Sequence, residues 1–413
     1  KKEIKKVVLQ NGMTLLLKED KTFPVIVLSA IFKGGVRLEN AGKSGVSELT
    51  SKLLMKGTKS KSEKEIGEII EGNGIDAGSF SGNNSFGIKM KFLSENEDIA
   101  LGIFSDLIKN SIFPESEFKR ELDLNLADLK VEENDVFGLG MRVFKKSVFR
   151  VHPYMNSPIG NQESLEKLKI ADCIKFYNDF CRPNNMVVAV FGDIDEKKIT
   201  AKFEDLFGDF KEVRLPEINI PSEPAQDTLR KSEINLDKKE ALLVIGVKTT
   251  TLRDPDKYAL EVISSVMSGQ DGRLFKKIRS GVGISYALGN QSITGIDPGY
   301  FIFYVATTKE FANMVEKIIL SEIERIKKEY VADEELLSAK KDLIGQDLLG
   351  RDSLSGFSIS SATDELLGLG FDNYKNYEEN INKVTKVDIK RIANKYFSSK
   401  ALNILMVTNN EAP

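Results

Sequence analysis

The residues best suited to chemistry are Arg279 and Tyr286, which lie in the run DGRLFKKIRSGVGISY at 271–286. A short basic amphipathic segment ends at Arg279 and leads into a turn that contains Gly281 and Gly283. Gly281 suits the positive φ of a helix C-cap, and the turn can bring Tyr286 back beside Arg279. A guanidinium and a phenol in one cleft can donate hydrogen bonds to a carbonyl oxygen, and more strongly as that oxygen gains charge. The alternative is a surface ion pair for Arg279 and a tyrosine packed with its hydroxyl at the rim.

Composition excludes a zinc site that needs two histidines. The chain has a single histidine, His152, in the loop-like run VHPY, where we expect it to be packed or at the solvent edge. The two cysteines, Cys173 and Cys181, lie on one predicted helix with their backbones about 12 Å apart, which is too far for a disulfide. No zinc-type cysteine pair is present. The histidine and cysteine content therefore predicts no zinc site of these two kinds in this chain.

Length and charge set the class of protein. The chain has 413 residues, of which 41% are hydrophobic and 29% charged, as is typical of a soluble globular protein with two to four domains. The formal net charge is -3, so nothing indicates a nucleic-acid partner. No apolar run approaches the length needed to span a bilayer.

The elements that must position these residues come in two copies. The apolar strand predicted at 24–33 is echoed at 241–250, and the segment 171–191 matches 387–407 at a constant offset of 216. Similarity at a fixed offset indicates two copies of one α/β unit. Each copy has strands followed by runs of helices, which predicts a mostly antiparallel sheet with helices packed on one face. The fold class is therefore α+β.

Residues 211–229 separate the two copies. This stretch has three of the eleven prolines and no helical periodicity, which is typical of a linker. We therefore expect an N-terminal domain at 1–212, a linker at 213–229 and a C-terminal domain at 230–413 that carries Arg279 and Tyr286. Two such halves can face each other across a cavity.

Several local signals in the first copy are specific. Asn11-Gly12 within 6–17 predicts a hairpin. A helix is expected at 62–73, where Ser62 and Glu65 have the spacing of a capping box. A longer amphipathic helix is expected at about 115–133.

Four runs together resemble the insulinase/pitrilysin family of zinc metallopeptidases, and more narrowly its short two-domain members related to mitochondrial processing peptidase. The runs are LQNGMTLLLKED, FKGGVRLENAGKSGVSELTSKLLMKGT, VHPYMNSPIGNQESLEKL and GRLFKKIRSGVGISYAL. The second run is the most specific, because family members carry a GLAHFLEHMLFKGT-like stretch there. The resemblance covers nearly the whole chain.

The chain departs from the family in that same run. The resemblance places the inverted His-x-x-Glu-His motif at 48–52, where this chain reads ELTSK. Glu48 stands in place of the first metal-binding histidine, Ser51 in place of the glutamate base, and Lys52 in place of the second histidine. The third ligand, a glutamate in the family, falls on Asp128.

A cluster of Glu48, Lys52 and Asp128 can form ion pairs, and Glu121 matches the supporting acid of the family. We expect no zinc there, because imidazole or thiolate normally anchors zinc and a lysine ammonium opposes a metal cation. An alternative is a magnesium ion held by Glu48 and Asp128.

Arg279 and Tyr286 match the family's arginine and tyrosine pair, which reaches toward the scissile carbonyl. In this family two short chains build one closed chamber, and in some pairs one subunit carries zinc while the other lacks it. The resemblance therefore implies a non-catalytic subunit of a heterodimeric zinc endopeptidase. A homologous partner would supply zinc and the base, while Arg279 and Tyr286 would hold the carbonyl of a peptide or unfolded polypeptide. In zinc-bearing relatives an edge strand near the equivalent of 75–81 holds the substrate.

Two alternatives remain at this point. The chain could be a structural or peptide-binding scaffold without a role in catalysis, as are core subunits of respiratory complexes related to this family, or a homodimeric peptide binder. Paired short members are often exported in bacteria. The chain begins at Lys1, as it would after a signal peptide is cleaved or after the chain is shortened. We therefore expect a periplasmic or exported protein rather than a cytoplasmic one.

Overall fold

The fold was analysed in a computed structural model, which describes residues 3–269, 272–280 and 287–409, with only the backbone described at 279 and 280. The chain divides into two compact units, and each is made of three segments. Unit 1 comprises Lys1–Leu129, Ser157–Ile220 and Leu349–Lys375. Unit 2 comprises Lys130–Asn156, Pro221–Leu348 and Asn376–Pro413.

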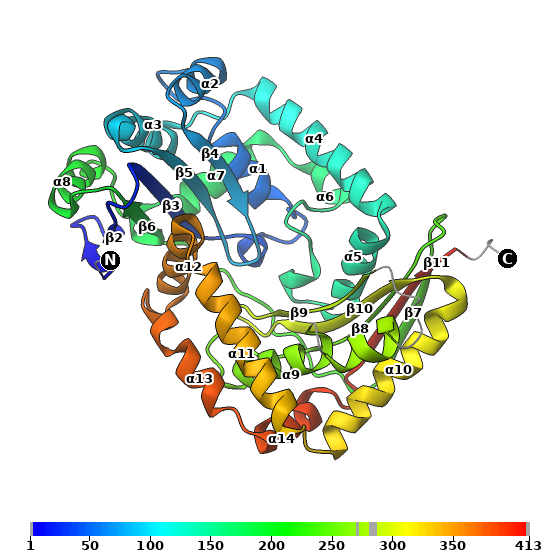
Figure 1. The fold of residues 1–413 in the computed structure, drawn as a ribbon. Helices are drawn as coiled ribbons and strands as arrows, with labels where there is room; N and C mark the ends of the chain where they lie inside the picture. The colour runs from blue at the N-terminus through cyan, green and yellow to red at the C-terminus, as the bar shows by residue number, and fades with distance from the viewer. Residues whose placement is uncertain (1–2, 270–271, 281–286, 410–413) are drawn as a thin grey trace. The chain divides into compact units, whose positions relative to one another are not determined.

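Unit 1 is built on a six-stranded sheet of order β1-β2-β6-β3-β5-β4 (Figure 1). Its strands are β1 Lys5–Val8, β2 Thr14–Glu19, β3 Val25–Lys33, β4 Asp76–Ser81, β5 Ser85–Leu93 and β6 Met186–Gly192. The pair β2 and β6 is parallel and the other pairs are antiparallel. β3 lies between β5 and β6, so the apolar run predicted at 24–33 is an inner strand.

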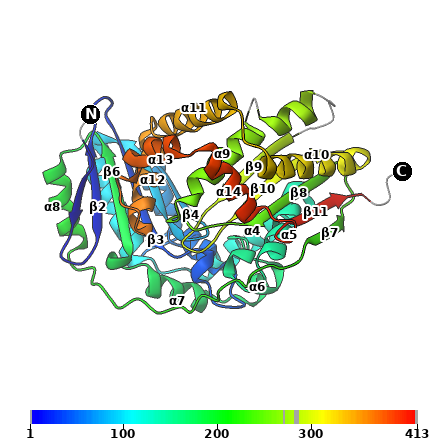
Figure 2. The ribbon, with the colours of Figure 1, turned by 90° about the horizontal axis from the view of Figure 1, so that it is seen from below.

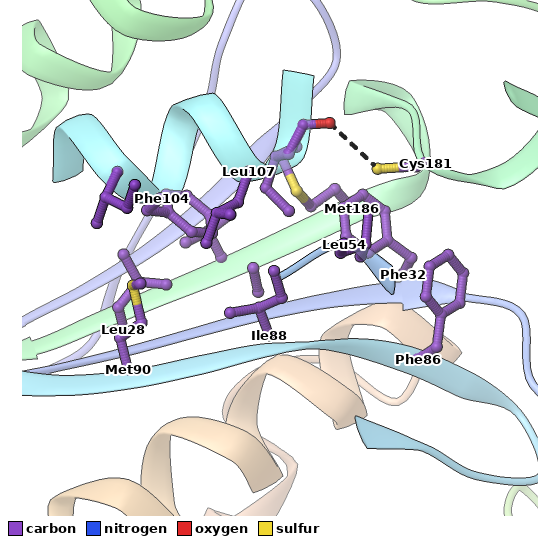
Figure 3. Close-up of a cluster of buried hydrophobic side chains, with 14 of the residues drawn as sticks. Leu28, Phe32, Leu54, Phe86, Ile88, Met90, Phe104, Leu107, Cys181 and Met186 are labelled. Carbon is purple, nitrogen blue, oxygen red and sulfur yellow. Dashed lines mark hydrogen bonds between the residues drawn. The ribbon is translucent and has the colours of Figure 1, made fainter. Parts of the chain in front are cut away.

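The main core of unit 1 lies between this sheet and its helices. Leu28, Ile88 and Met90 of the strands face Phe104 and Leu107 of α3, and all five side chains are buried (Figure 3). The helices of unit 1 are α1 Val46–Leu53, α2 Glu63–Gly72, α3 Glu97–Asn110, α4 Glu115–Asn134, α6 Gln162–Lys167, α7 Ile170–Phe180, α8 Glu196–Phe207 and α12 Leu354–Leu367, of which α4 continues into unit 2.

Unit 2 is built on a five-stranded sheet of order β7-β11-β8-β10-β9. Its strands are β7 Arg230–Asn235, β8 Ala241–Lys248, β9 Ala287–Ile293, β10 Tyr300–Thr307 and β11 Asn403–Thr408. Its helices are α5 Val136–Val148, α9 Asp256–Ser268, the π-helix η5 Phe275–Ser280, α10 Lys309–Lys328, α11 Asp333–Gly350, α13 Tyr377–Lys383 and α14 Lys386–Tyr396. The pair β7 and β11 is parallel and the other pairs are antiparallel.

The predicted two-copy α+β organisation is confirmed. The order of unit 2 repeats that of unit 1 from β2 onward, with β7, β11, β8, β10 and β9 in the places of β2, β6, β3, β5 and β4. α7 and α14 begin at Ile170 and Lys386, a difference of 216 positions. Each sheet is mostly antiparallel, as expected.

Each sheet also has a helix on its second face, and that helix comes from the other copy of the repeat. α5, from the first half of the chain, packs on β8 and β11, and α12, from the second half, packs on β3 and β6 (Figures 1 and 2). The prediction of helices on one face did not include these two helices. The bounds 1–212 and 230–413 describe the repeat in the sequence. In the structure, Lys130–Asn156 belongs to unit 2, although it lies in the first copy, and Leu349–Lys375 belongs to unit 1, although it lies in the second.

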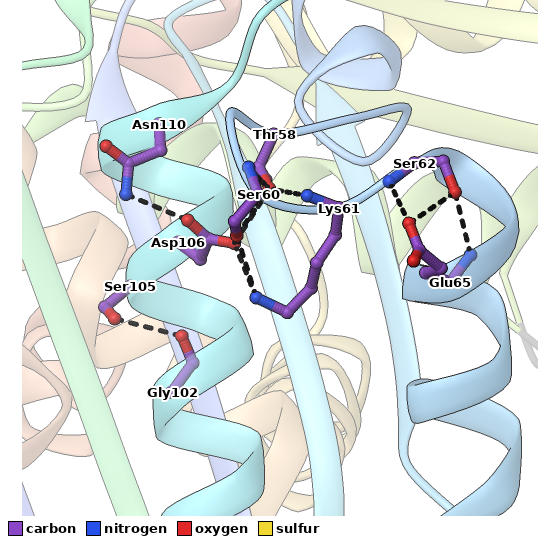
Figure 4. Close-up of polar contacts among 9 residues, drawn as sticks. All are labelled: Thr58, Ser60, Lys61, Ser62, Glu65, Gly102, Ser105, Asp106 and Asn110. Atoms are coloured by element: carbon purple, nitrogen blue, oxygen red, sulfur yellow. Dashed lines mark hydrogen bonds and ion pairs between the residues drawn. The ribbon is translucent and has the colours of Figure 1, made fainter.

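The local signals have the expected structures. β1 and β2 form an antiparallel hairpin with Gly12 at a φ of 82°. The capping box of α2 is complete: Ser62 Oγ accepts from the Glu65 N–H, and the Glu65 carboxylate accepts from the Ser62 N–H (Figure 4). The described residues 211–229 form neither helix nor strand. None of the helices in the described ranges is long and apolar enough to cross a membrane.

Candidate functional site

α1 carries the segment where the zinc motif was expected, and its N-terminus is fixed by buried groups. The helix starts after Gly45, which has a φ of 96° that side chains rarely adopt. Glu39 Oε1 accepts the backbone N–H groups of Gly45 and Ser47, each at 3.1 Å. The apolar face of α1 joins the main core, so the opposite face presents Glu48 and Lys52.

Lys52 makes two contacts to oxygen atoms on that face. Its Nζ donates to Asn125 Oδ1 at 2.7 Å and lies 3.6 Å from Glu48 Oε1. Ser51 Oγ donates to the backbone oxygen of Glu48 at 2.8 Å, so this hydroxyl is engaged within its own helix. Burial raises the pKa of Glu48, the charge of Lys52 lowers it, and the negative charge of Asp128 raises it further.

The expected ion pair between Glu48 and Lys52 is therefore present. The second oxygen atom that Lys52 contacts belongs to Asn125 and not, as expected, to Asp128. Asp128 is exposed, whereas Asn125 is fully buried on α4. Glu121 is also buried and is paired with Lys56, from Nζ to Oε1, at 3.2 Å. Sequence reasoning missed Asn125, although its spacing from Glu121 is i to i+4, which places both on one helix face.

The residues at this site do not fit zinc. The Lys52 ammonium already lies at hydrogen-bonding distance from the oxygen atom that α4 directs toward α1. Neither His152 nor a cysteine belongs to the site. Among the described residues, no group of three or more His, Cys, Asp or Glu side chains could hold a metal ion. No catalytic step through a metal in this chain follows from this arrangement.

The predicted pair of Arg279 and Tyr286 lies outside what the structure describes, apart from the backbone of Arg279 in η5. The residues before Arg279 are firmly anchored. Arg273 donates to Glu335 through Nε and Nη2, at 2.7 and 2.8 Å. This guanidinium lowers the pKa of Glu335 to about 2.

Apolar packing and a buried carboxylate also hold the segment that precedes Arg279. Leu274 and Ile278 are fully buried in the core of unit 2, which confirms the apolar side predicted for this segment. Glu322 of α10 is also fully buried; it pairs with Lys277 and lies 3.8 Å from Arg273. The chain that leads to Arg279 is thus held against both α10 and α11.

β4 is the last strand of its sheet, at the position expected for an edge strand at 75–81. It pairs with β5 on one side, and no strand pairs with its other side in the described ranges. α1 packs beside β4, and Ser81 Oγ donates to Ser47 Oγ at 2.8 Å. The unpaired edge therefore lies next to the helix that carries Glu48 and Lys52.

His152 is a packed residue, as one of the expectations stated. It is 2% exposed, its Nε2 lies 3.1 Å from Asp297 Oδ2, and its Nδ1 accepts the Tyr154 N–H at 3.1 Å. Cys173 and Cys181 are buried free thiols, and burial raises the pKa of Cys173 to about 12. These groups are therefore structural rather than reactive.

Comparison with known families gives two matches along the chain. Residues 15–144 match the family described as "Insulinase (Peptidase family M16)". Residues 167–343 match the domain described as "Peptidase M16 inactive domain". The first match lies within the first copy of the repeat, and the second match runs from the end of the first copy into the second.

Similar proteins include some that are named zinc protease and one that is named non-peptidase homolog. An "Uncharacterized zinc protease" of Rickettsia felis is 27% identical over 97% of both chains. Two proteins of Helicobacter pylori are each 25% identical: "Zinc protease PqqE", over 95% of this chain and 89% of that one, and "Non-peptidase homolog YmxG", over 93% and 88%.

Solved structures share the fold. A protease from Helicobacter pylori superposes with a TM-score of 0.92 at 22% identity, over 98% of this chain and 99% of that one. A peptidase M16 inactive domain from Pseudomonas fluorescens superposes with a TM-score of 0.90 at 19% identity, over 99% of both chains.

Proposed function

The chain belongs to the insulinase family of peptidases as a member without the zinc motif, and we propose that it is the non-catalytic subunit of a heterodimeric zinc endopeptidase. A homologous zinc-bearing chain would supply the metal, its bound hydroxide and the glutamate base. This chain would supply Arg279 and Tyr286 to the scissile carbonyl of a peptide. The substrates would be peptides or unfolded segments.

The observation that carries this proposal is the position of Lys52. Lys52 stands on α1 at the position that the resemblance assigns to a metal-binding histidine, and its ammonium lies 2.7 Å from Asn125 Oδ1. A chain of this kind cannot activate water on zinc by itself. If it takes part in proteolysis, another chain has to provide the metal.

The sequence around Arg279 supports a chain that still takes part in proteolysis rather than one that has lost this role. The run GRLFKKIRSGVGISYAL is kept in a form that resembles the family, while the zinc motif is lost. Removal of one donor to a developing oxyanion lowers kcat by roughly 10²–10³-fold in comparable sites. Loss of one set of groups and retention of the other is what a division of labour between two subunits requires.

A pair of relatives in one organism supports the same idea. Helicobacter pylori has a relative named zinc protease and another named non-peptidase homolog, and this chain is 25% identical to each. Relatives with both kinds of printed name therefore occur in at least one organism. No strand of the described ranges pairs with the outer edge of β4, and such an edge can hold an extended peptide largely without regard to sequence.

The test is to mix the purified chain with a zinc-bearing relative from the same source and to measure hydrolysis of a quenched fluorescent peptide. We expect activity in the mixture and little in either chain alone. Arg279→Ala and Tyr286→Phe should each lower kcat roughly 10²–10³-fold, because each removes a donor to the oxyanion. Binding of the two chains should not change.

Lys276→Ala is the matched control, because it removes an exposed cation three positions from Arg279. It should leave kcat unchanged. Full activity of the zinc-bearing relative alone, or unchanged kcat in both Arg279→Ala and Tyr286→Phe, would count against the proposal.

The second candidate is a structural or peptide-binding scaffold of the same fold. The printed name "Non-peptidase homolog" of one relative favours it. A scaffold predicts that the chain binds peptide or partner while the mixture gains no hydrolysis. The same assay therefore separates the two functions.

A further inference from the structure

The sheets of the two units differ at one edge. β2 and β7 are equivalent strands of six residues, and they begin at Thr14 and Arg230, a difference of 216 positions. Each forms a parallel pair on one side, β2 with β6 and β7 with β11. On its other side β2 pairs with β1, whereas no strand of the described ranges pairs with the outer side of β7 (Figure 1). Unit 2 therefore lacks a described strand at the position that β1 fills in unit 1.

The outer side of β7 carries backbone groups that can pair with another strand. The Arg230 N–H donates to Leu402 O at 3.1 Å, so this residue faces β11. Alternate residues of a strand direct their backbone groups to opposite sides, and Lys231 and Glu233 therefore face outward. Within the ranges that the structure describes, the N–H and C=O groups of these two residues have no hydrogen-bond partner. They form a template for main-chain pairing.

The charged side chains of β7 do not guard this edge. Natural edge strands often direct charges against an incoming strand. Here Lys231 Nζ lies 2.6 and 2.8 Å from the two carboxylate oxygens of Glu316 on α10. Glu233 Oε1 accepts from Thr408 Oγ1 of β11 at 3.1 Å. Both side chains are thus engaged on the helix-covered face of their own sheet, and the edge itself stays open.

The composition of β7 suits a strand that binds and leaves. At an offset of 216 positions, Lys231 and Glu233 correspond to Leu15 and Leu17 of β2, whose side chains are fully buried. In unit 1 the strand beside β1 is therefore part of the core. β7 reads RKSEIN, and four of its six residues are exposed. Such a strand remains hydrated when its outer side is empty.

We propose that the outer side of β7 is a binding site for an extended peptide segment, which adds antiparallel to β7 as β1 adds to β2. Main-chain pairing supplies most of the affinity in this mode of recognition. In the register of β1 the residue opposite Glu233 corresponds to Lys5, which is paired with Leu17 in unit 1. A basic residue at that place gives a cross-strand pair of opposite charge. The inference does not rest on the proposed function, since strand pairing here needs neither zinc nor a partner chain.

The probe is a fluorescent peptide with the sequence EIKKVVLQ of residues 3–10, whose binding to the full chain is followed by anisotropy. We expect saturable binding. Lys231→Pro should lower the affinity by roughly tenfold or more, because it removes an outward N–H and obstructs the incoming strand. An edge strand tolerates proline at such a position. Lys231→Ala is the matched control: it loses the ion pair with Glu316 but keeps the N–H, and it should bind like the unchanged chain.

N-methylated peptides test the same geometry without a change in the protein. In the register of β1, the amides of Lys5 and Val7 face the neighbouring strand, and those of Lys6 and Val8 face away. Methylation of the Val7 amide should abolish binding, and methylation of the Val8 amide should preserve it. Glu233→Lys should weaken binding of this basic peptide and strengthen binding of a version with glutamate in place of Lys5.

The absence of saturable binding would overturn the proposal. So would equal affinities of Lys231→Pro and the unchanged chain, or equal binding of the two methylated peptides, which decide the matter by themselves if Lys231→Pro does not fold. A doubling of the mass of the chain in solution that Lys231→Pro abolishes would also overturn it, because the edge would then pair with a second copy of the chain.

Discussion

Glu39 shows how one buried residue can prepare the helix that carries the site. It is 7% exposed, and its Oε1 accepts two N–H groups at the start of α1. Burial raises the pKa of Glu39 to about 8, and the hydrogen bonds from Ser47 and Gly45 oppose this rise only in part. Its Oε2 has no hydrogen-bond partner in the described ranges. The carboxyl is therefore held largely in its neutral form near neutral pH.

This raised pKa predicts a loss of stability as pH increases. The unfolded chain releases the Glu39 proton near pH 4.5, whereas the folded chain keeps it to about pH 8. Between these values the folded state binds more protons, so the free energy of unfolding falls as pH rises and levels off above about pH 8. Each pKa unit between the two states corresponds to about 1.4 kcal/mol. Urea unfolding at pH 6 and pH 9 should show a smaller loss for Glu39→Gln than for the unchanged chain.

The control for Glu39 is an exposed carboxyl. Glu163→Gln removes a carboxylate that is paired with Lys167 on the surface of α6, and it should leave the pH dependence nearly unchanged. Equal losses of stability in Glu39→Gln and in the unchanged chain between pH 6 and pH 9 would contradict the argument.

Among the elements, α5 and α12 have the most unusual positions. Each belongs to one copy of the repeat and packs on the sheet of the other. Phe144 of α5 is fully buried and lies 6.0 Å, between ring centroids, from Tyr300 of β10. Phe357 of α12 packs in the same way against Phe191 of β6, at 5.6 Å. Each helix therefore stabilises a sheet that is far from it in the sequence.

The exchange of helices predicts reciprocal effects. Phe144→Ala should lower the free energy of unfolding by about 3–5 kcal/mol, because it leaves a cavity in a packed core. Hydrogen exchange should become faster in β8 and β11 and stay unchanged in β3 and β6. Phe357→Ala should show the opposite pattern, so each variant is the control for the other. Faster exchange in the same sheet for both variants would contradict the assignment of these helices.

The sequence predicted the elements whose apolar periodicity is strong and local. The hairpin, the inner strand, the capping box of α2 and the repeat all have such signals. Neither α5 nor α12 was predicted: α5 has a clear apolar face, but Gly138 and Gly140 interrupt the helix, whereas α12 is rich in serine and has only a weak apolar periodicity. A Cβ at Gly140 would lie 2.5 Å from Leu242 Cδ2, so this glycine permits close packing on a sheet that local sequence cannot identify.

At the candidate site, the contact within one helix was predicted from the sequence and the contact between two helices was not. The ion pair of Glu48 and Lys52 follows from their i to i+4 spacing on one helix. Lys52 and its partner Asn125 lie on two different helices and are 73 positions apart in the sequence. The local sequence around a polar residue on an amphipathic helix does not identify such a distant partner. Tertiary packing, rather than local pattern, decides which amide oxygen meets the ammonium.

At the scale of the whole molecule, the two units have different parts of the chemistry that the family resemblance links. Unit 1 has the Glu48 and Lys52 pair and the unpaired edge of β4. Unit 2 has the anchored segment that leads to Arg279. Each unit has its own sheet and core, so the loss of the zinc motif does not deprive either unit of its packing.

This independence from metal predicts that chelation will not affect stability. A metal bound to the folded state stabilises it by about 4 kcal/mol when its free concentration is a thousand times Kd, so its removal shifts the unfolding midpoint. For this chain we expect far less than one zinc per molecule by mass spectrometry of the metals, and the same urea midpoint with and without EDTA. A relative with an intact His-x-x-Glu-His motif, treated in parallel, should retain zinc and lose stability in EDTA. One tightly held zinc per chain would mean that other residues bind it, and would remove the basis for assigning 48–52 to the lost motif.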